Sequence, residues 1–162
     1  MNDKITVRYG AGDLAVPLLI LAFFAALNVF TLIFTNMKAL SILVLVLLAA
    51  YAAAVICPTV LFFLRAEGDS FYSSSRTGRK YDFRLSDIKS ITCTERRNYK
   101  YGVKYFVEIR TADGSVILHH SMKGFGELAA FLLEKHSSGE LSSSVLSKKC
   151  REYLEQYASQ SK

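Results

Sequence analysis

The sequence predicts a membrane α-helical hairpin followed by an α+β cytoplasmic domain. Neither Leu14 to Met37 nor Ala39 to Leu64 contains a formally charged residue, and beyond Arg65 the apolar residues recur with a period of two. A bilayer hydrocarbon core about 30 Å thick needs roughly 20 apolar residues of helix, so each uncharged run is long enough to span it. The 162 residues therefore combine an anchor with one small domain.

Two other interpretations of the uncharged runs are weaker. A pair of buried core helices would need more covering chain than the roughly 100 remaining residues provide. A signal peptide has a shorter apolar core and a small-residue cleavage site, whereas here a second run follows the first after Lys38 alone. We expect two retained spans, at about 14–35 and 39–64.

Positive residues flank the hairpin on one side. Lys4 and Arg8 precede the first span, and the second span is followed by Arg65, Arg76, Arg79, Lys80 and Arg84. Because Lys and Arg accumulate in short cytoplasmic flanks, we expect a multi-pass protein of the cell (inner) membrane with both termini in the cytoplasm.

The first span begins near Asp13, a plausible N-cap, with Pro17 in its opening turns. Small residues four apart predict close helix packing in lipid, at Ala22, Ala26, Ala49, Ala50, Ala53 and Ala54. Asn28 and Thr31 suggest interhelical hydrogen bonds rather than a pathway, since neither span contains an ionisable Asp, Glu, Lys, Arg or His. Pro58 predicts a kink or a weakened last turn in the second span.

The cytoplasmic domain is predicted over 65–137. We expect a strand over Glu67 to Ser74, alternating strands around 81–85, 88–91 and 103–109, and an Asp-Gly hairpin turn at 113–114 into a strand ending at His120. A helix over Phe125 to His136 closes the domain. The segment 138–162 then contains a Ser-rich linker and an amphipathic helix from about 143 to 159. Its apolar stripe needs cover, from the domain's own surface or from another protomer.

The stretches DFRLSDIKSI, YFVEIRTADGSVIL and GFGELAAFLLEK resemble the bacterial pleckstrin-homology-like (PH-like) domains, as in the YcxB-like membrane proteins. The matching features are Ser86-Asp87-Ile88, Asp113-Gly114 and the helix from Glu127 to Lys135. The resemblance implies an antiparallel PH-like sheet or partial barrel closed by a C-terminal helix. About five strands are evident where seven are usual, and the segment 1–12, in which Ile5, Val7 and Tyr9 alternate with polar residues, is a possible added strand.

A basic and aromatic hairpin lies between two of the predicted strands. Its residues are Arg96, Arg97, Tyr99, Lys100, Tyr101 and Lys104, and Arg79 and Lys80 form a second basic turn. Basic residues next to aromatic ones suit an anionic membrane surface or single-stranded nucleic acid. The third interpretation is a solvated loop without a ligand, which is what most charged runs are. The adjacent anchor favours lipid headgroups over nucleic acid. The resemblance supplies no phosphoinositide site, because the basic motif of lipid-binding PH domains lies in the first strand pair.

No arrangement of residues predicts catalysis. His119 and His120 are adjacent on a strand and should point to opposite faces, and Cys57, Cys93 and Cys150 are scattered without metal-ligand spacing or a disulfide framework. We expect neither enzyme activity nor a cofactor or metal. The expected function is a membrane-anchored binding or assembly module that contacts membrane lipids, with a protein partner or a second copy at the C-terminal helix. The alternative is an accessory subunit of a transport or export complex that acts through its hairpin.

Overall fold

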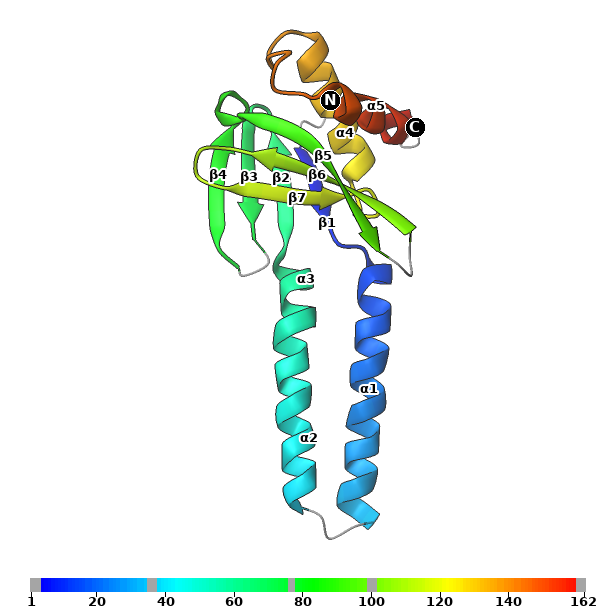
Figure 1. Ribbon diagram of the computed structural model, residues 1–162. Coiled ribbons are helices and arrows are strands. Elements are labelled where there is room, and N and C mark those ends of the chain that lie inside the picture. The colour runs from blue at the N-terminus through cyan, green and yellow to red at the C-terminus, as the bar shows by residue number, and fades with distance from the viewer. Residues whose placement is uncertain (1–3, 35–37, 76–77, 99–101, 160–162) are drawn as a thin grey trace.

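The computed structural model describes residues 4–34, 38–75, 78–98 and 102–159, with only the backbone described at 34, 96–98 and 102–104. Figure 1 shows two long antiparallel helices and, at one end of them, a β domain that contains the first and the last elements of the chain. The chain leaves the domain after its first strand, runs through both helices and returns. The helical hairpin is therefore an insertion into the β domain.

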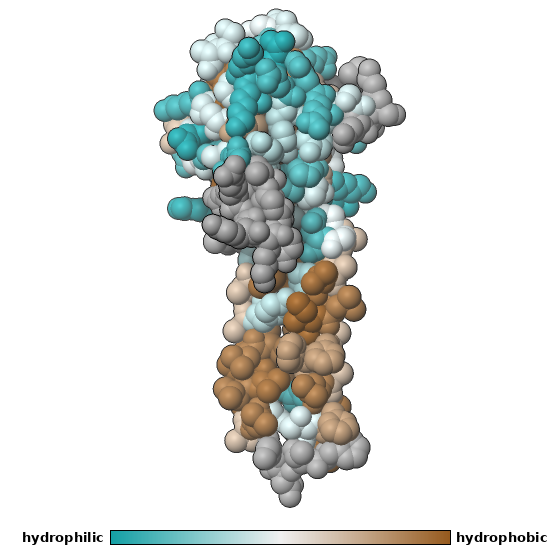
Figure 2. Space-filling model, turned by 45° about the vertical axis from the view of Figure 1, so that its right-hand side comes forward, coloured by the Kyte–Doolittle hydropathy of each residue, from teal (hydrophilic) through white to brown (hydrophobic). Residues whose placement is uncertain are grey.

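The helices present an apolar surface to their surroundings. The first is α1 (Ala11–Phe34), and the second consists of α2 (Lys38–Tyr51), a π-helical turn (Ala52–Ile56) and α3 (Cys57–Leu61). Two stretches, Ala11–Ile33 and Lys38–Leu61, are long and apolar enough to cross a membrane, and only 6% of the most apolar window of each is buried. Figure 2 shows mostly apolar residues over the helices and mostly polar ones over the β domain. The exposure shows that they are not core helices of the domain.

The contact between the two helices includes one buried hydrogen bond. The side-chain amide of Asn28 donates to the carbonyl oxygen of Ser41 at 2.9 Å, and both residues are buried. This confirms the interhelical role expected of Asn28. The hydroxyl of Thr31 donates to the carbonyl of Leu27 within α1. The small residues predicted to pack in the membrane are exposed on the helix surfaces, namely Ala22, Ala26, Ala49, Ala50, Ala53 and Ala54.

Pro58 alters the second helix, as its position predicted. The π-helical turn Ala52–Ile56 immediately precedes α3, and proline at this point removes a backbone donor from the helix. The helix then ends at Leu61, before the expected limit at Leu64. Leu64 is completely buried in the β domain. The end of the apolar run therefore belongs to strand β2. Leu64 is apolar because it faces the protein core, and not because it faces lipid.

Seven described strands form two antiparallel sheets, one in the order β1-β2-β3-β4 and one in the order β5-β6-β7. Their bounds are β1 (Lys4–Arg8), β2 (Phe63–Glu67), β3 (Ser70–Ser74), β4 (Lys80–Arg84), β5 (Ser90–Asn98), β6 (Gly102–Arg110) and β7 (Ser115–His119). The strand predicted over Glu67 to Ser74 is wrong in its extent, because a turn at Gly68-Asp69 separates β2 from β3. The expectation was one antiparallel sheet or a partial barrel, but among the described residues no strand joins the two sheets and sheet closure is not found.

The N-terminal segment is part of the first sheet. Strand β1 pairs antiparallel with β2, with Val7 opposite Leu64 and Arg8 opposite Phe63. Val7 has no exposed surface. The two strands that continue into the helices are thus neighbours, which explains why α1 and α3 leave the domain side by side (Figure 1).

Two helices complete the core at the end of the domain away from the hairpin (Figure 1). Helix α4 (Phe125–Ser137) matches its predicted bounds closely, whereas α5 (Lys148–Ala158) begins later than expected because Ser147 is its N-cap, accepting from the Cys150 amide at 3.3 Å. Cys150 and Leu154 on α5 are buried within the same cluster as Phe71 and Phe125. The domain's own surface therefore covers the apolar stripe of α5.

Candidate functional site

The turn between β3 and β4 returns to the end of the second helix. Gly78 lies so close to α3 that a Cβ on it would be 3.6 Å from a methyl group of Leu61. Arg79 and Lys80 follow directly, and both are exposed. The backbone amide of Arg79 donates to the hydroxyl of Ser75 at 3.1 Å, which holds the turn closed. These two predicted site residues are thus fixed at the helix-proximal end of the β domain.

The β5–β6 hairpin also extends toward the helices (Figure 1). Its backbone register places position 96 opposite position 104, and the described strands end with Asn98 opposite Gly102. The side chains of Arg96, Arg97 and Lys104, and the whole of Tyr99, Lys100 and Tyr101, lie outside the described residues. The backbone alone therefore brings both predicted basic segments to the same end of the domain.

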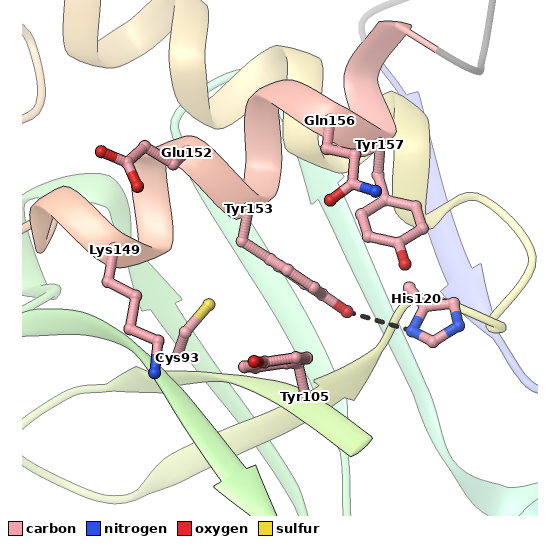
Figure 3. A pocket seen from close by; sticks show the side chains of 8 residues that line it. All are labelled: Cys93, Tyr105, His120, Lys149, Glu152, Tyr153, Gln156 and Tyr157. Atoms are coloured by element: carbon pink, nitrogen blue, oxygen red, sulfur yellow. Dashed lines mark hydrogen bonds between the residues drawn. The ribbon is translucent and has the colours of Figure 1, made fainter. Parts of the chain in front are cut away.

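A pocket of about 470 Å³ lies between α5 and the second sheet. Figure 3 shows its lining, which is Cys93, Tyr105, His120, Lys149, Glu152, Tyr153, Gln156 and Tyr157. The Tyr153 hydroxyl is hydrogen-bonded to Nδ1 of His120 at 3.0 Å, and the His120 ring stacks on Tyr157 with centroids 4.8 Å apart. Burial raises the pKa of Tyr153, with a smaller contribution from Tyr157, so its phenol stays neutral at physiological pH. The pocket therefore offers aromatic faces, the hydrogen-bonded pair Tyr153 and His120, and the charged side chains of Lys149 and Glu152.

The two histidines lie together, which corrects the expectation that they point to opposite faces. Their ring centroids are 4.1 Å apart. Strand β7 ends at His119, so His120 lies in the following turn and does not obey the alternation of a strand. Nδ1 of His119 is 2.8 Å from the Ser121 hydroxyl. His120 lines the pocket beneath α5, and the His119 ring packs against Phe106 with centroids 5.1 Å apart.

Two cysteines that are 57 residues apart in the chain also meet beneath α5, with 2.9 Å between the sulfur atoms of Cys93 and Cys150. Cys150 is buried, whereas Cys93 is half-buried. The hydrogen bond between the two thiols, together with the nearby Lys149 ammonium, lowers the pKa of Cys93. The same bond and burial raise the pKa of Cys150. Cys57 is exposed on α3, far along the chain from this pair.

Comparisons with known proteins give no relative from which a role could be transferred. No family model, no curated protein and no solved structure matches this chain.

Sequence reasoning identified the basic turns but missed the residues that line the pocket beneath α5. Cys93 and Tyr105 lie on paired strands, whereas Tyr153 and Tyr157 lie on a helix about 50 residues further along the chain, so only tertiary contacts bring them together. The one available signal was the apolar stripe of α5. It predicted which face of the helix is covered, but not which strand residues cover it.

Proposed function

We propose that this chain is a membrane-anchored, non-catalytic binding or assembly module, in which a helical hairpin holds a PH-like domain against an anionic lipid surface. The observation that carries the proposal is the contact between the β3–β4 turn and the end of α3. It keeps Arg79 and Lys80 at the level where the second helix meets the domain. Each Lys or Arg near an anionic surface contributes about 1 kcal/mol to binding.

The helices support the membrane part of the proposal. Their length, their apolar composition and their largely exposed apolar surfaces suit a lipid surrounding. An apolar surface of this size is unfavourable in water. Because β1 and α5 belong to the same domain, the first and the last described elements lie on one side of the hairpin. The distribution of positive residues favours the cytoplasm for that side.

The strand arrangement supports the PH-like part. The resemblance calls for seven strands and a following helix, and the described residues form sheets of four and three strands followed by α4. Two features are additions to that pattern: the hairpin inserted between β1 and β2, and helix α5. A protein partner or a second copy would meet α5 from its outer side, since its inner side is already covered.

The experiment needs a soluble form of the β domain that retains β1. Because Arg8 pairs with Phe63, a Gly-Ser linker of about four residues can join Tyr9 to Phe62 and close β1 and β2 into a hairpin. Flotation of this variant with neutral and anionic vesicles should show binding to anionic vesicles only. Arg79→Gln with Lys80→Gln should weaken that binding about 30-fold.

A matched control removes the same charge elsewhere. The starts of β5 and α5 lie at the end of the domain away from the helices (Figure 1). Lys89 immediately precedes β5, Lys148 is the first residue of α5, and both are exposed. Lys89→Gln with Lys148→Gln should leave vesicle binding nearly unchanged. Equal losses of vesicle binding in the two double variants, or no binding by a folded domain, would contradict the lipid contact. Recovery of the full chain in the soluble fraction would contradict the membrane anchor.

A second candidate function rests on the exposed small residues of the hairpin. Because the six alanines are not buried between α1 and α2, they are accessible to another membrane helix. This favours the alternative of an accessory subunit in a transport or export complex. Replacing Ala22 and Ala26 with Leu should then abolish co-purification of a membrane partner while the β domain remains folded. In the first proposal the same change has no effect on lipid binding.

A further inference from the structure

Two cations lie directly opposite each other where the helices join the β domain. Arg8, at the end of β1, and Lys123, in the turn before α4, exchange two backbone hydrogen bonds, of 3.2 Å and 2.9 Å. Residues paired in this way project their side chains on the same face, with Cβ atoms about 5 Å apart. The backbone therefore forces an arginine and a lysine side by side.

The turn that carries Lys123 cannot move away easily. The next residue, Gly124, has a φ of 83°, and a Cβ on it would lie 2.3 Å from the carbonyl oxygen of Thr6. Only glycine combines this left-handed conformation with such a close approach to another backbone. The cation pair is thus built into the fold rather than formed by two mobile side chains that happen to meet.

No acidic side chain neutralises this pair among the described residues. Arg8 and Lys123 are exposed, and neither has an ion pair within the described part of the chain. Asp13, the described acid nearest to Arg8 along the chain, accepts a hydrogen bond from the amide of Gly10 at 2.8 Å. Glu127, four residues after Lys123, takes part in none of the ion pairs of the described residues. Like charges directly opposite each other on neighbouring strands are destabilising. An anion bound between Arg8 and Lys123 would attract both side chains and so turn this repulsion into a net attraction.

The pair opens onto a pocket of about 540 Å³ between the two helices and the sheet. Its polar side contains Arg8, Lys123 and Thr6, and its apolar side contains Leu14, Val60 and Phe63. Leu14 comes from the start of α1 and Val60 from the end of α3. The apolar side thus continues into the exposed apolar surface of the helices, whereas the polar side faces the domain.

We propose that this pocket binds one anionic glycerophospholipid, with its phosphate between Arg8 and Lys123 and its acyl chains along Leu14 and Val60. The inference rests on the proposed membrane anchor, because the lipid reaches the pocket from the bilayer. A phosphate ion in solution satisfies the two cations but gains nothing from the apolar side. A glycerophospholipid satisfies both sides, since its charge and its hydrocarbon meet at one end of the molecule, as they do in the pocket.

The test uses the full chain, purified in a neutral detergent, and native mass spectrometry with added phosphatidylglycerol, phosphatidylcholine or inorganic phosphate. We expect one phosphatidylglycerol to be retained per chain, in clear preference to the other two. Arg8→Gln with Lys123→Gln should weaken its binding about 30-fold. The charge-matched pair Lys89→Gln with Lys148→Gln should bind as the unmodified chain does.

Thermal unfolding gives a second readout, because the two cations should lower the melting temperature without lipid and raise it when phosphatidylglycerol is bound. In neutral detergent Arg8→Gln should melt no lower than the unmodified chain, because the substitution removes a repulsion. Phosphatidylglycerol should raise the melting temperature of the unmodified chain but not that of the double variant. Equal retention of phosphatidylglycerol by the double variant, or equal retention of inorganic phosphate by the unmodified chain, would overturn the inference.

Membrane integration of the same variants separates this inference from the proposed function. Carbonate-resistant sedimentation of the full chain reports the anchor alone. If the unmodified chain fails to integrate, the proposed function fails, and this inference fails with it. If every variant integrates and all retain phosphatidylglycerol equally, only the lipid site is wrong.

Discussion

Leu45 in α2 and Leu64 in β2 are the same residue type in two opposite surroundings. The side chain of Leu45 is 54% exposed and that of Leu64 has no exposed surface. In the β domain, apolar residues are buried by sheets and helices that cover one another, whereas in the hairpin most of them face outward. The comparison teaches that the described residues of the hairpin bury no apolar side chain, so its stability depends on the medium around it. The β domain is stabilised by the apolar side chains that it buries itself.

The largest effect is expected at a glycine of the domain. Gly124 and Gly139 share a φ of 83°, but a Cβ on Gly139 would meet nothing within 4 Å. Gly124→Ala should therefore lower the free energy of unfolding by about 4 kcal/mol, and Gly139→Ala by about 1–2 kcal/mol. Urea unfolding in neutral detergent, followed by tyrosine fluorescence in this tryptophan-free chain, measures both. Equal losses would show that the contact with Thr6 does not matter.

The two leucines provide the next test. Leu64→Ala should cost the domain about 3 kcal/mol, because it leaves a cavity in a fully buried site. Leu45→Ala should change the unfolding of the domain by no more than about 0.5 kcal/mol. The same urea titrations compare them. A comparable loss for Leu45→Ala would mean that the hairpin and the domain unfold as one unit.

A smaller effect is expected within the hairpin. Asn28→Leu removes the hydrogen bond to the Ser41 carbonyl, a kind of contact worth about 0.6 kcal/mol between membrane helices. The distance between labelled ends of α1 and α2, followed during denaturation, should report this loss while the domain's midpoint stays constant. Thr59→Val serves as the control, since the Thr59 hydroxyl donates to the Val55 carbonyl in its own helix. A greater loss in the control would contradict the interhelical role of Asn28.

The last prediction concerns reactivity and not stability. The Cys150 thiol and, to a lesser degree, Lys149 lower the pKa of Cys93. In a Cys57→Ala background, Cys150→Ala should therefore raise the pKa of Cys93 and move the pH midpoint of its alkylation by iodoacetamide upward. Lys149→Gln should move it in the same direction by less. A midpoint that stays in place or falls in Cys150→Ala would contradict the thiol contact.

Much of the fold was predictable because it depends on local periodicity. The uncharged runs locate both helices of the hairpin, and the helical spacing of apolar residues locates α4 almost to the residue. The errors occur where an apolar residue serves two kinds of structure equally well. Leu64 extends the apolar run of the second helix, yet it is the inward-facing residue of a strand. Composition alone does not distinguish lipid from a protein core as the reason for an apolar side chain.

The sequence by itself determined the hairpin, the number of charges around it and the amphipathic face of α5, because periodicity and composition act over a few turns of chain. Only the tertiary structure decided which distant residues meet. It placed β1 against β2 across the whole hairpin, Cys93 against Cys150, and Arg8 against Lys123. Each of these contacts depends on backbone pairing or packing between separate elements. No local pattern encodes such contacts, because they exist only once the two sheets and helices α4 and α5 have enclosed a common core.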